Sequence, residues 1–388
     1  MIQTVVHTKI PVNVSFCKRC IYHSDIPSIT FDSEGVCNYC RQYDEMQLTY
    51  PTGAEGQRRL VQMADEIKKA GKGKDYDVVI GVSGGCDSSY MLSLAKDIGL
   101  RPLAAHYDNT WNTKIAVENI KNVLEKLNVD LYTHVADNHE VNDVMKSLML
   151  ASVPEIEAAT DLALATTHYL ACEKFKVKYI WEGHSFRTEG ISPPGWFYMD
   201  AKYITGIQKK FGTMPIQTIP LLYLEKWLKW MLLNKIKKQR PLYFMDYDKE
   251  ATKKYLTNSF NWQWYGGHHM ENRTAYFCNN YYLPVKFNID LRWCEFSAHV
   301  RSGQMTRNEA LEKIEEPKPF DKTILEEVFT RLNITESEFE RIIKLPPKSY
   351  RDYKTYKETF IRMRPFFWLM YKSGYVTKSF YDKFTVKN

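Results

Sequence analysis

A buried strand that runs into a glycine-rich turn and then a helix constrains this chain more than any other stretch. The predicted strand covers Val78 to Val82, the turn has the sequence S-G-G-C-D-S-S at 83–89, and the predicted helix runs from Ser89 to Ile98. Glycine lacks a Cβ, so backbone N–H groups can approach an anion closely, while serine hydroxyls and the positive end of the helix dipole face the same place. The pattern predicts a phosphate-binding loop. Its expected contact residues are Ser83, Gly84, Gly85 and Ser88.

Asp87 is the unusual member of this loop, because a carboxylate repels phosphate unless a cation lies between them. It indicates Mg²⁺ bound together with a nucleotide, and we predict both a nucleotide-binding and a catalytic role for it. Neither G-x-x-x-x-G-K-[ST] nor G-x-G-x-x-G followed by a ribose-binding acid occurs, which disfavours ordinary P-loop and Rossmann sites. The loop resembles the PP-loop of the ATP pyrophosphatases, which implies ATP binding and transfer of AMP to a carbonyl oxygen. The alternative is a strand-to-helix turn without catalytic consequence.

Further strands and helices alternate after this loop, which predicts an α/β fold with a doubly wound parallel sheet. The expected strands are 102–107, 130–135 and 178–181, and the expected helices are 115–127, 141–150 and 155–174. In such a sheet ligands bind outside the carboxyl ends of the strands. Asp108 follows one strand, and is predicted to contact the nucleotide or the substrate rather than only to cap a turn or helix. Gly183 and His184 follow the last strand, where PP-loop enzymes carry a second glycine-containing ATP contact.

Three more side chains are candidates for the catalytic set. Asp161 lies on an otherwise apolar helix, and the alternatives are a paired buried carboxylate or an exposed one. Arg187 follows the last predicted strand and could face the reacting group or be a surface loop charge. Glu271 belongs to a second glycine-marked polar segment, Y-G-G-H-H-M-E-N-R at 265–273, which suits a substrate loop.

The N-terminal region carries two C-x₂-C pairs separated by 16 residues. Four cysteines at this spacing fit a tetrahedral structural zinc site, with a loop between the pairs that we expect to form a short hairpin. Two disulfides are the alternative, which a reducing compartment disfavours. The predicted ligands are Cys17, Cys20, Cys37 and Cys40.

Composition and charge are those of a soluble protein, and we expect a cytoplasmic location without a signal peptide or transmembrane segment. The net charge of +7 favours anionic substrates without requiring nucleic acid, and we expect none as a partner. The segment 221–240 holds six basic residues and one acidic residue around Trp227 and Trp230. It predicts an amphipathic helix, packed on the core or lying at a membrane surface or partner.

We expect four regions in the chain. They are a four-cysteine zinc module at 1–50, a linker helix at 51–75, a PP-loop ATP-binding domain at 76–200, and a mainly helical region for substrate or partner docking at 201–388.

Several segments in the same order resemble the N-acetyl sugar amidotransferases of bacterial surface-polysaccharide and flagellar glycan biosynthesis. They are the cysteine pairs, S-G-G-C-D-S-S, E-G-H at 182–184, Y-G-G-H-H-x-E at 265–271, and the run from Y-L-P at 282 to S-G-Q-M-T-R at 302–307. The resemblance runs from about Phe16 to Pro317. It implies the zinc and nucleotide residues named above, with ATP, Mg²⁺ and Zn²⁺ as cofactors. It also implies conversion of a sugar N-acetyl group to an acetamidino group through an O-adenylyl imidate attacked by ammonia, in O-antigen or related glycan biosynthesis.

The ammonia has to come from outside this chain. No cysteine follows Met1 and no G-x-C-x-G motif is present, so we expect no glutaminase activity here. The resemblance implies partner subunits similar to the glutaminase and cyclase of the histidine-pathway synthase, which pass ammonia across an interface, and a nucleotide-linked N-acetyl sugar as substrate. The main alternative is a PP-loop enzyme that thiolates tRNA, which would need a reactive cysteine pair such as Cys86 and Cys172. A non-catalytic zinc-ribbon module with a degenerate nucleotide domain is a further alternative.

Overall fold

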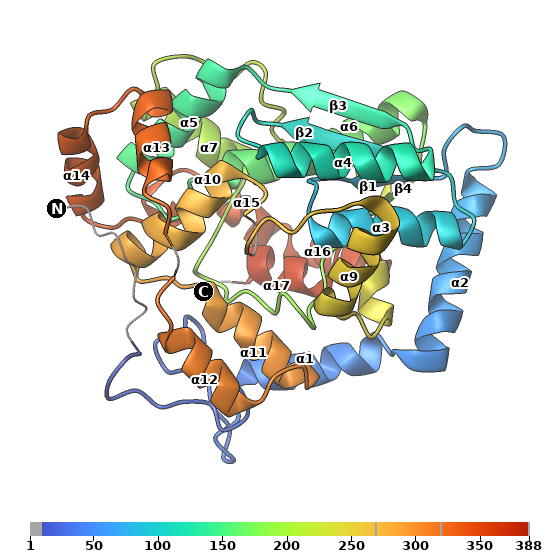
Figure 1. Cartoon of the computed structure of the whole chain (residues 1–388), viewed down its shortest axis with the longest axis horizontal. Coiled ribbons are helices and arrows are strands. Elements are labelled where there is room, and N and C mark those ends of the chain that lie inside the picture. Colours follow the sequence, from blue (N-terminus) through green and yellow to red (C-terminus); the bar gives the residue numbers. More distant parts are fainter. Residues whose placement is uncertain (1–9, 268–269, 319, 387–388) are drawn as a thin grey trace.

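Five short parallel strands form the centre of the fold in a computed structural model that describes residues 10–267, 270–318 and 320–386 (Figure 1). The strands are β1 (Val78–Gly81), β2 (Pro102–Asp108), β3 (Leu131–Val135), β4 (Tyr179–Trp181) and β5 (Lys237–Gln239). They lie in the order β3-β2-β1-β4-β5 with every neighbouring pair parallel. The direction of winding reverses between β1 and β4, where doubly wound sheets bind their ligands.

Helices cover both faces of the sheet, as the alternation along β1 requires. Val78 and Ile80 pack toward one face and Val79 toward the other, because successive side chains of a strand point to opposite sides. The first face carries α2 (Gly53–Ala70), α3 (Cys86–Asp97), α4 (Lys114–Leu127) and α9 (Lys249–Phe260). The second carries α6 (Ala158–Phe175) and α8 (Leu224–Leu232). The predicted doubly wound fold is therefore confirmed.

The helix after the phosphate loop begins three residues earlier than predicted. Gly85 is its extended N-cap, so Cys86, Asp87 and Ser88 form the first turn of α3. The aspartate and the second serine of the motif thus lie at the positive end of the helix rather than before it.

The segment 221–240 is not one helix. After α8, Lys235 takes a positive φ of 55°, and the chain then adds β5 beside β4 with Tyr179 opposite Lys237. Trp227 and Trp230 are buried, and Trp230 stacks on Tyr169 with ring centroids 5.0 Å apart, so packing on the core is confirmed. The sheet thereby takes its fifth strand from beyond residue 200, and the four region limits given above stay predictions.

The N-terminal module consists of turns followed by a single helix, whereas the C-terminal half is built mainly from helices. The helix of the module is α1 (Asn38–Thr49), which has Cys37 as its N-cap and contains Cys40. The C-terminal region contains α10 (Arg273–Phe277), a π-helix (Cys278–Phe287), α11 (Arg292–Ser302), α12 (Arg307–Glu315), α13 (Thr323–Leu332), α14 (Glu336–Lys344), α15 (Lys357–Arg362), α16 (Arg364–Lys372) and α17 (Lys378–Thr385), together with the 3-10 helices Pro241–Phe244 and Tyr350–Asp352. α12 starts with a capping box formed by Thr306 and Glu309.

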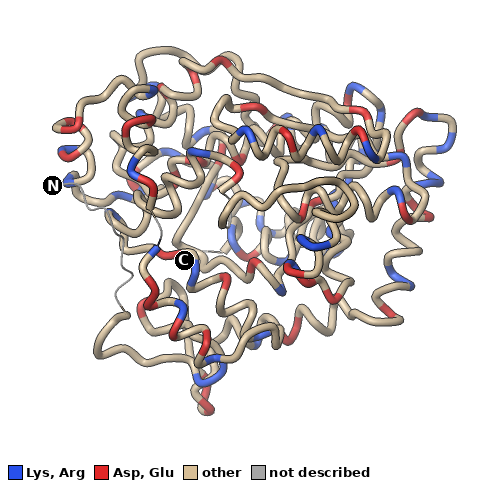
Figure 2. The backbone as a smooth tube through the Cα atoms, viewed as in Figure 1, with Lys and Arg blue, Asp and Glu red and all other residues tan. Residues whose placement is uncertain are grey.

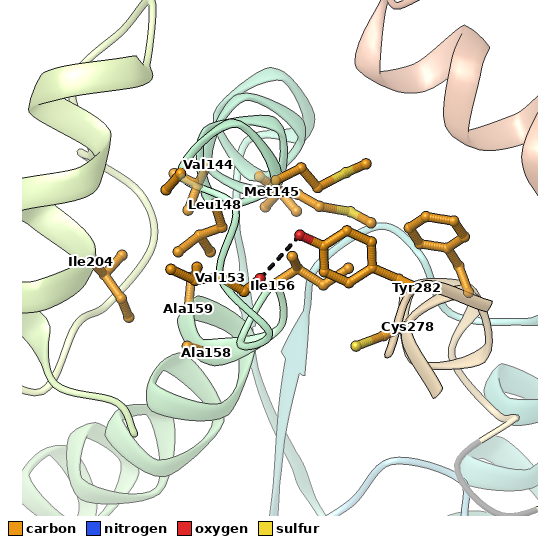
Figure 3. Packing of buried hydrophobic residues seen from close by; sticks show 14 of the residues in the cluster. Val144, Met145, Leu148, Val153, Ile156, Ala158, Ala159, Ile204, Cys278 and Tyr282 are labelled. Carbon is orange, nitrogen blue, oxygen red and sulfur yellow. Dashed lines mark hydrogen bonds between the residues drawn. The ribbon is translucent and has the colours of Figure 1, made fainter. Parts of the chain in front are cut away.

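A hydrophobic cluster fixes the start of α6 against the π-helix. Side chains of α5 (Asn138–Leu150), α7 (Ala201–Phe211) and the connection into α6 converge there (Figure 3). The hydroxyl of Tyr282 donates a hydrogen bond to the carbonyl oxygen of Val153 at 3.0 Å. Ala158 of α6 and Cys278 of the π-helix belong to this cluster and also line a cavity described below. The packing therefore sets how the C-terminal region faces that cavity.

Charge is mixed along the molecule. Figure 2 shows basic and acidic residues interleaved, for example along α4, where Lys114, Glu118, Lys121 and Glu125 form ion pairs one turn apart. Among the helices that the structure describes, none has the length and apolar character needed to cross a membrane.

Candidate active site

The phosphate loop has a conformation that only glycine allows at its second position. Gly84 has a φ of 80°, and a Cβ built there would lie 2.3 Å from the carbonyl oxygen of Ala116 at the start of α4. The Gly84 carbonyl accepts hydrogen bonds from Trp262 Nε1 at 3.0 Å and Asn119 Nδ2 at 3.2 Å. The loop is therefore clamped between α3, α4 and the segment after α9.

The rest of the loop is arranged for an anion. Ser83 Oγ accepts the N–H of Gly85 at 3.3 Å, and Ser88 Oγ donates to the carbonyl of Gly85 at 3.2 Å. The N-cap residue of α3, Gly85, has no side chain to accept the first N–H groups of the helix, although the N–H of Cys86 bonds to the side chain of Tyr265. The start of a 12-residue helix at the end of a central strand fits a phosphate site in geometry and charge.

A cation lies beside Asp87, as its place in a phosphate loop requires. Lys249 Nζ is 3.2 Å from Asp87 Oδ2, and the hydroxyl of Tyr247 donates to Oδ1. Burial alone would lower the pKa of Lys249, but Asp87, Glu189 and Glu295 outweigh it and raise that pKa, so the ammonium is charged. Sequence reasoning missed Lys249 and Tyr247, whose only local signal is the polar run D-Y-D-K at 246–249.

A cavity of about 450 Å³ opens beside Ser83 and contains two of the predicted catalytic residues. Glu271 Oε1 lies 3.4 Å from Ser83 Oγ, within reach of a hydrogen bond, and Asp161 lines the same cavity from the first turn of α6. Other lining residues are His106, Asn109, Asn112, Glu155, Glu157, Cys278 and Lys383. The structure thus brings the phosphate loop, Asp161 and Glu271 together. The histidines at 268 and 269 of the substrate-loop motif lie outside the described residues.

Asp108 holds a turn at the end of β2 and is not among the residues lining the cavity. Its Oδ1 accepts the N–H of Thr110 at 2.7 Å and Asn112 Nδ2 at 3.2 Å, which is the turn role considered as its alternative. Asn109 and Asn112 line the cavity instead, and Asn272 Nδ2 donates to both, at 2.9 and 3.1 Å. The polar residues that follow β2 thus include two that line the cavity, Asn109 and Asn112. The amides face the cavity, and nucleotide contact by Asp108 stays a prediction.

Gly183 and His184 lie on the other side of the loop, at the end of β4. A Cβ on Gly183 would stand 3.4 Å from the backbone and Cβ of Asp87, so this glycine allows close packing on the first turn of α3. His184 Nδ1 is 2.9 Å from the hydroxyl of Tyr243, and Nε2 is 3.8 Å from Glu189. Burial, reinforced by Arg240, lowers the pKa of His184 to about 3, so its imidazole is neutral. Gly183 borders the phosphate loop, and ATP contact by Gly183 and His184 stays a prediction.

Arg187 is not among the residues that line the cavity beside Ser83, and its contacts indicate a structural role instead of the predicted catalytic one. The side chain is buried on the aromatic ring of Phe186, and its guanidinium donates to the carbonyls of Tyr243 at 2.6 Å and Tyr50 at 2.9 Å. These bonds tie the end of α1 to the 3-10 helix after β5. Sequence alone could not show this, because both acceptors are backbone atoms far away along the chain.

Replacing Arg187 with methionine should therefore destabilise the fold without impairing the chemistry of the folded protein. Two buried carbonyls would lose charge-assisted hydrogen bonds, at a cost of about 3 kcal/mol. Urea unfolding measures this loss, and kcat per folded molecule should stay within about twofold. Arg59→Met, at an exposed ion pair on α2, is the matched control and should change stability by less than about 0.5 kcal/mol. A folded R187M variant with an activity lower by orders of magnitude would support the catalytic role.

The four predicted zinc ligands form one buried cluster. Their Sγ atoms all lie within 4.8 Å of one another, and all eight cysteines of the chain are free thiols. Backbone N–H groups of Arg19, Cys20 and Cys37 point at Cys17 Sγ at 3.3 to 3.5 Å, as they do around metal thiolates. From α11, Arg301 donates to Cys20 Sγ at 3.2 Å and to Cys40 Sγ at 3.4 Å. The donor set and the buried compensating cation fit a tetrahedral thiolate site that could hold zinc.

Known proteins resemble parts of this chain. Residues 271–366 match the family described as LPS biosynthesis protein WbpG-like, C-terminal domain. An uncharacterized protein, MJ1599, of Methanocaldococcus jannaschii is 28% identical over 171 residues, which are 43% of this chain and 58% of that relative. The chain thus spans little more than half the length of the curated relative it matches.

Two solved structures are similar at low identity. The NMN synthetase from Francisella tularensis is 16% identical, with a TM-score of 0.31 over 72% of this chain and 96% of that one. The NH3-dependent NAD synthetase from Campylobacter jejuni is 15% identical, with a TM-score of 0.26 over 53% of this chain and 93% of that one. With TM-scores this low, neither similarity carries a conclusion about activity.

The doubly wound sheet with the S-G-G-C-D-S-S loop at its switch point has the arrangement expected for a nucleotide-binding domain that resembles the PP-loop ATP pyrophosphatases. The chain also carries a WbpG-like C-terminal domain, and Glu271 and Asn272 at its start reach the phosphate loop and the end of β2. Together these observations bring a loop with phosphate-site geometry next to a domain that matches a lipopolysaccharide-biosynthesis family.

Proposed function

We propose that this chain is an ATP-dependent amidotransferase that converts a sugar N-acetyl group to an acetamidino group, in O-antigen or related glycan biosynthesis. One observation carries the proposal. The cavity of about 450 Å³ is lined by Ser83 of the phosphate loop and by several residues between 271 and 291 of the domain that matches the lipopolysaccharide-biosynthesis family. A substrate held by that domain would lie next to the α-phosphorus of a nucleotide bound at Ser83.

The reaction balances without any redox partner. The amide oxygen attacks the α-phosphorus of ATP and pyrophosphate leaves, which gives an O-adenylyl imidate. Ammonia adds to the imidate carbon and gives up its extra proton, and AMP leaves with the former amide oxygen. Adenylation is needed because an amide oxygen is a poor leaving group, and the protein contributes mainly by orienting the reactants and excluding water.

The residues at the site divide this work. The N–H groups at the start of α3, with Ser83 and Ser88, would hold the phosphates, and Lys249 would offset the charge of the departing pyrophosphate. Mg²⁺, when bound with ATP, would neutralise phosphate charge, and Asp87 is the carboxylate that could hold it. Asp161 and Glu271 line the cavity where the amide would lie, and are the candidates for taking the proton from ammonia.

The partners and the location belong to the same proposal. Free ammonia would serve as the nitrogen donor in vitro. With glutamine the chain would need glutaminase and cyclase-like subunits that resemble the histidine-pathway synthase. The acceptor would be a nucleotide-linked N-acetyl sugar, and the reaction would take place in the cytoplasm, where ATP is abundant.

The positions of Cys86 and Cys172 argue against the tRNA-thiolation alternative. Cys86 packs on the α3 face of the sheet and Cys172 in a separate cluster on the opposite face. Burial raises the pKa of Cys86 to about 12 and raises the pKa of Cys172 as well, so both are protonated thiols. A pair of reactive thiolates at the phosphate loop is therefore not formed by these two residues.

The deciding experiment follows AMP, ADP and sugar mass together. Purified protein is incubated with Mg·ATP, ammonium and a panel of nucleotide-linked di-N-acetyl sugars that carry ¹⁸O in the amide. We expect sugar-dependent AMP that contains the label, and a product in which oxygen is replaced by NH. ADP instead of AMP, or unlabelled AMP, would rule out the adenylyl mechanism, and AMP formed only with tRNA would favour RNA modification.

Replacing Lys249 with methionine should lower the rate of AMP formation by about 100-fold, because a charged group beside the leaving phosphates is lost from a buried site. The same assay under saturating ATP measures the loss. Lys254→Met changes an exposed lysine on the same helix and should leave the rate unaltered. Equal rates for K249M and the wild type would show that Lys249 serves only to pair with Asp87.

A further inference from the structure

A second cavity, of about 430 Å³, lies on the β4–β5 side of the sheet. It is roofed by residues 356–384, which include α15, α16 and α17, neighbours in space at the centre of Figure 1. Its volume is in the range of small-molecule sites. No residue of the phosphate loop 83–89 is among those that line it, so it is a separate compartment from the candidate ATP site.

The walls of this second cavity are rich in tyrosine and its floor is charged. The lining tyrosines are Tyr50, Tyr169, Tyr243, Tyr356, Tyr371 and Tyr375. The floor is formed by Glu182 after β4 and by Lys238 and Arg240 of the β5 strand and its end. The faces of tyrosine rings can stack on any nucleobase, and tyrosine hydroxyls can bind polar groups.

The charged floor has one more cation than anions. Glu182 accepts Lys238 Nζ at 2.6 Å and Arg240 Nε at 3.0 Å. Burial would raise the pKa of Glu182, but the two cations outweigh it and hold that pKa well below its usual range, so all three groups are charged. About a quarter of each cationic side chain stays exposed. A lysine and an arginine together offer more N–H groups than one carboxylate accepts, which leaves donors for an anion.

The two cavities share a wall. Met199 lines both cavities. Asp161 and Lys383 line the cavity beside Ser83, and the residues that follow them in sequence, Leu162 and Phe384, line the second cavity. Methionine is unbranched and adapts its shape readily, so the wall at Met199 is the place where one extended ligand could pass from one cavity to the other.

We propose that the second cavity binds the nucleoside diphosphate carrier of the sugar substrate, with its base among the tyrosines and its phosphates at Lys238 and Arg240. The sugar would then extend past Met199 and present its acetamido group in the first cavity. The position of the acetamido group in the first cavity rests on the proposed function, whereas binding of the nucleoside diphosphate in the second cavity does not. A polyprenyl diphosphate offers the same phosphates, but its chain is far longer than a compartment of about 430 Å³ can hold.

Calorimetric titration of the full chain with uridine, guanosine and cytidine diphosphates, without sugar, tests the proposal. At least one should bind, and saturation with a non-hydrolysable ATP analogue and Mg²⁺ should leave its affinity unchanged. Lys238→Gln and Tyr375→Ala should each weaken binding about tenfold or more, through the phosphates and the base respectively. Lys229→Gln, at a surface ion pair on α8, should bind like the wild type. Thermal unfolding checks that each variant is folded.

The other outcomes are distinct. Competition with the ATP analogue would place the diphosphate at the phosphate loop and overturn the proposal. So would wild-type affinity in both K238Q and Y375A, or binding of polyprenyl diphosphate alone. If the diphosphate binds as expected but no sugar supports AMP formation, the cavity assignment stands and the amidotransferase fails. Where turnover exists, K238Q should raise KM for the nucleotide sugar and leave KM for ATP unchanged.

Discussion

Replacing Gly84 with alanine is expected to abolish AMP formation, with a rate at least about 100-fold below the wild type. At a φ of 80° a residue with a Cβ costs about 1 to 2 kcal/mol. The larger effect is steric, because the new methyl group would lie 2.3 Å from the carbonyl oxygen of Ala116, an atom of the α4 backbone. Either α4 or the phosphate loop has to move, and a shift of about 1 Å in phosphate-binding N–H groups is enough for such a loss.

Gly73→Ala is the control that distinguishes the cost of backbone strain from a loss of phosphate binding. Gly73 has a φ of 76° in the loop after α2, and a Cβ there would meet nothing within 4 Å. Gly73→Ala should lose about 1 kcal/mol of unfolding free energy and keep full activity. Steady-state AMP formation, ATP binding by calorimetry and urea unfolding should be compared for both variants. Normal ATP affinity in G84A would show that this loop does not hold the phosphates.

Replacing Cys20 with serine is expected to release one zinc ion per chain and to unfold the N-terminal module. The four thiols of this cluster are buried, and a module of this size depends on its metal for folding energy on the order of 10 kcal/mol. Arg301 of α11 would lose one of its two cysteine acceptors, which weakens the compensation of a buried charge, so the damage should extend to α11. Metal analysis of the purified protein and thermal unfolding provide the measurement.

Cys294→Ser is the control for this prediction. Cys294 is also buried in the cluster around the module, where its thiol donates to the carbonyl of Glu189, but it is not one of the four clustered cysteines. This variant should keep its zinc and most of its stability. A wild-type protein that holds no metal and contains two disulfides among the four cysteines would overturn the zinc assignment.

Contiguous patterns of residues were enough to predict several features of the molecule. The phosphate loop and the alternation of strands and helices are local, because each depends on residues a few positions apart. The cysteine pairs are a local pattern as well, and the four thiols do lie together. The resemblance between ordered motifs pointed to glycan biosynthesis, and residues 271–366 do match a family of lipopolysaccharide biosynthesis.

The strand β5 and the buried cation Arg187 were harder to predict, for a physical reason in each case. β5 has the sequence K-K-Q at the edge of the sheet, so it lacks the apolar run of a central strand, and the sequence predicts a helix there. Arg187 has the residue type and position of a catalytic cation, but its hydrogen bonds go to two backbone carbonyls, which no side-chain pattern reveals.

By itself the sequence determined that this chain has a phosphate loop on a doubly wound sheet, because backbone conformation there follows from the glycines, the buried strand and the helix start. Only the tertiary structure decided which side chains surround that loop. Tyr247, 160 positions away in sequence, reaches Asp87, and Glu271, 188 positions away, reaches Ser83. Such contacts depend on how whole helices pack, since the energy of packing is spread over many apolar residues and not over the few polar ones it brings together.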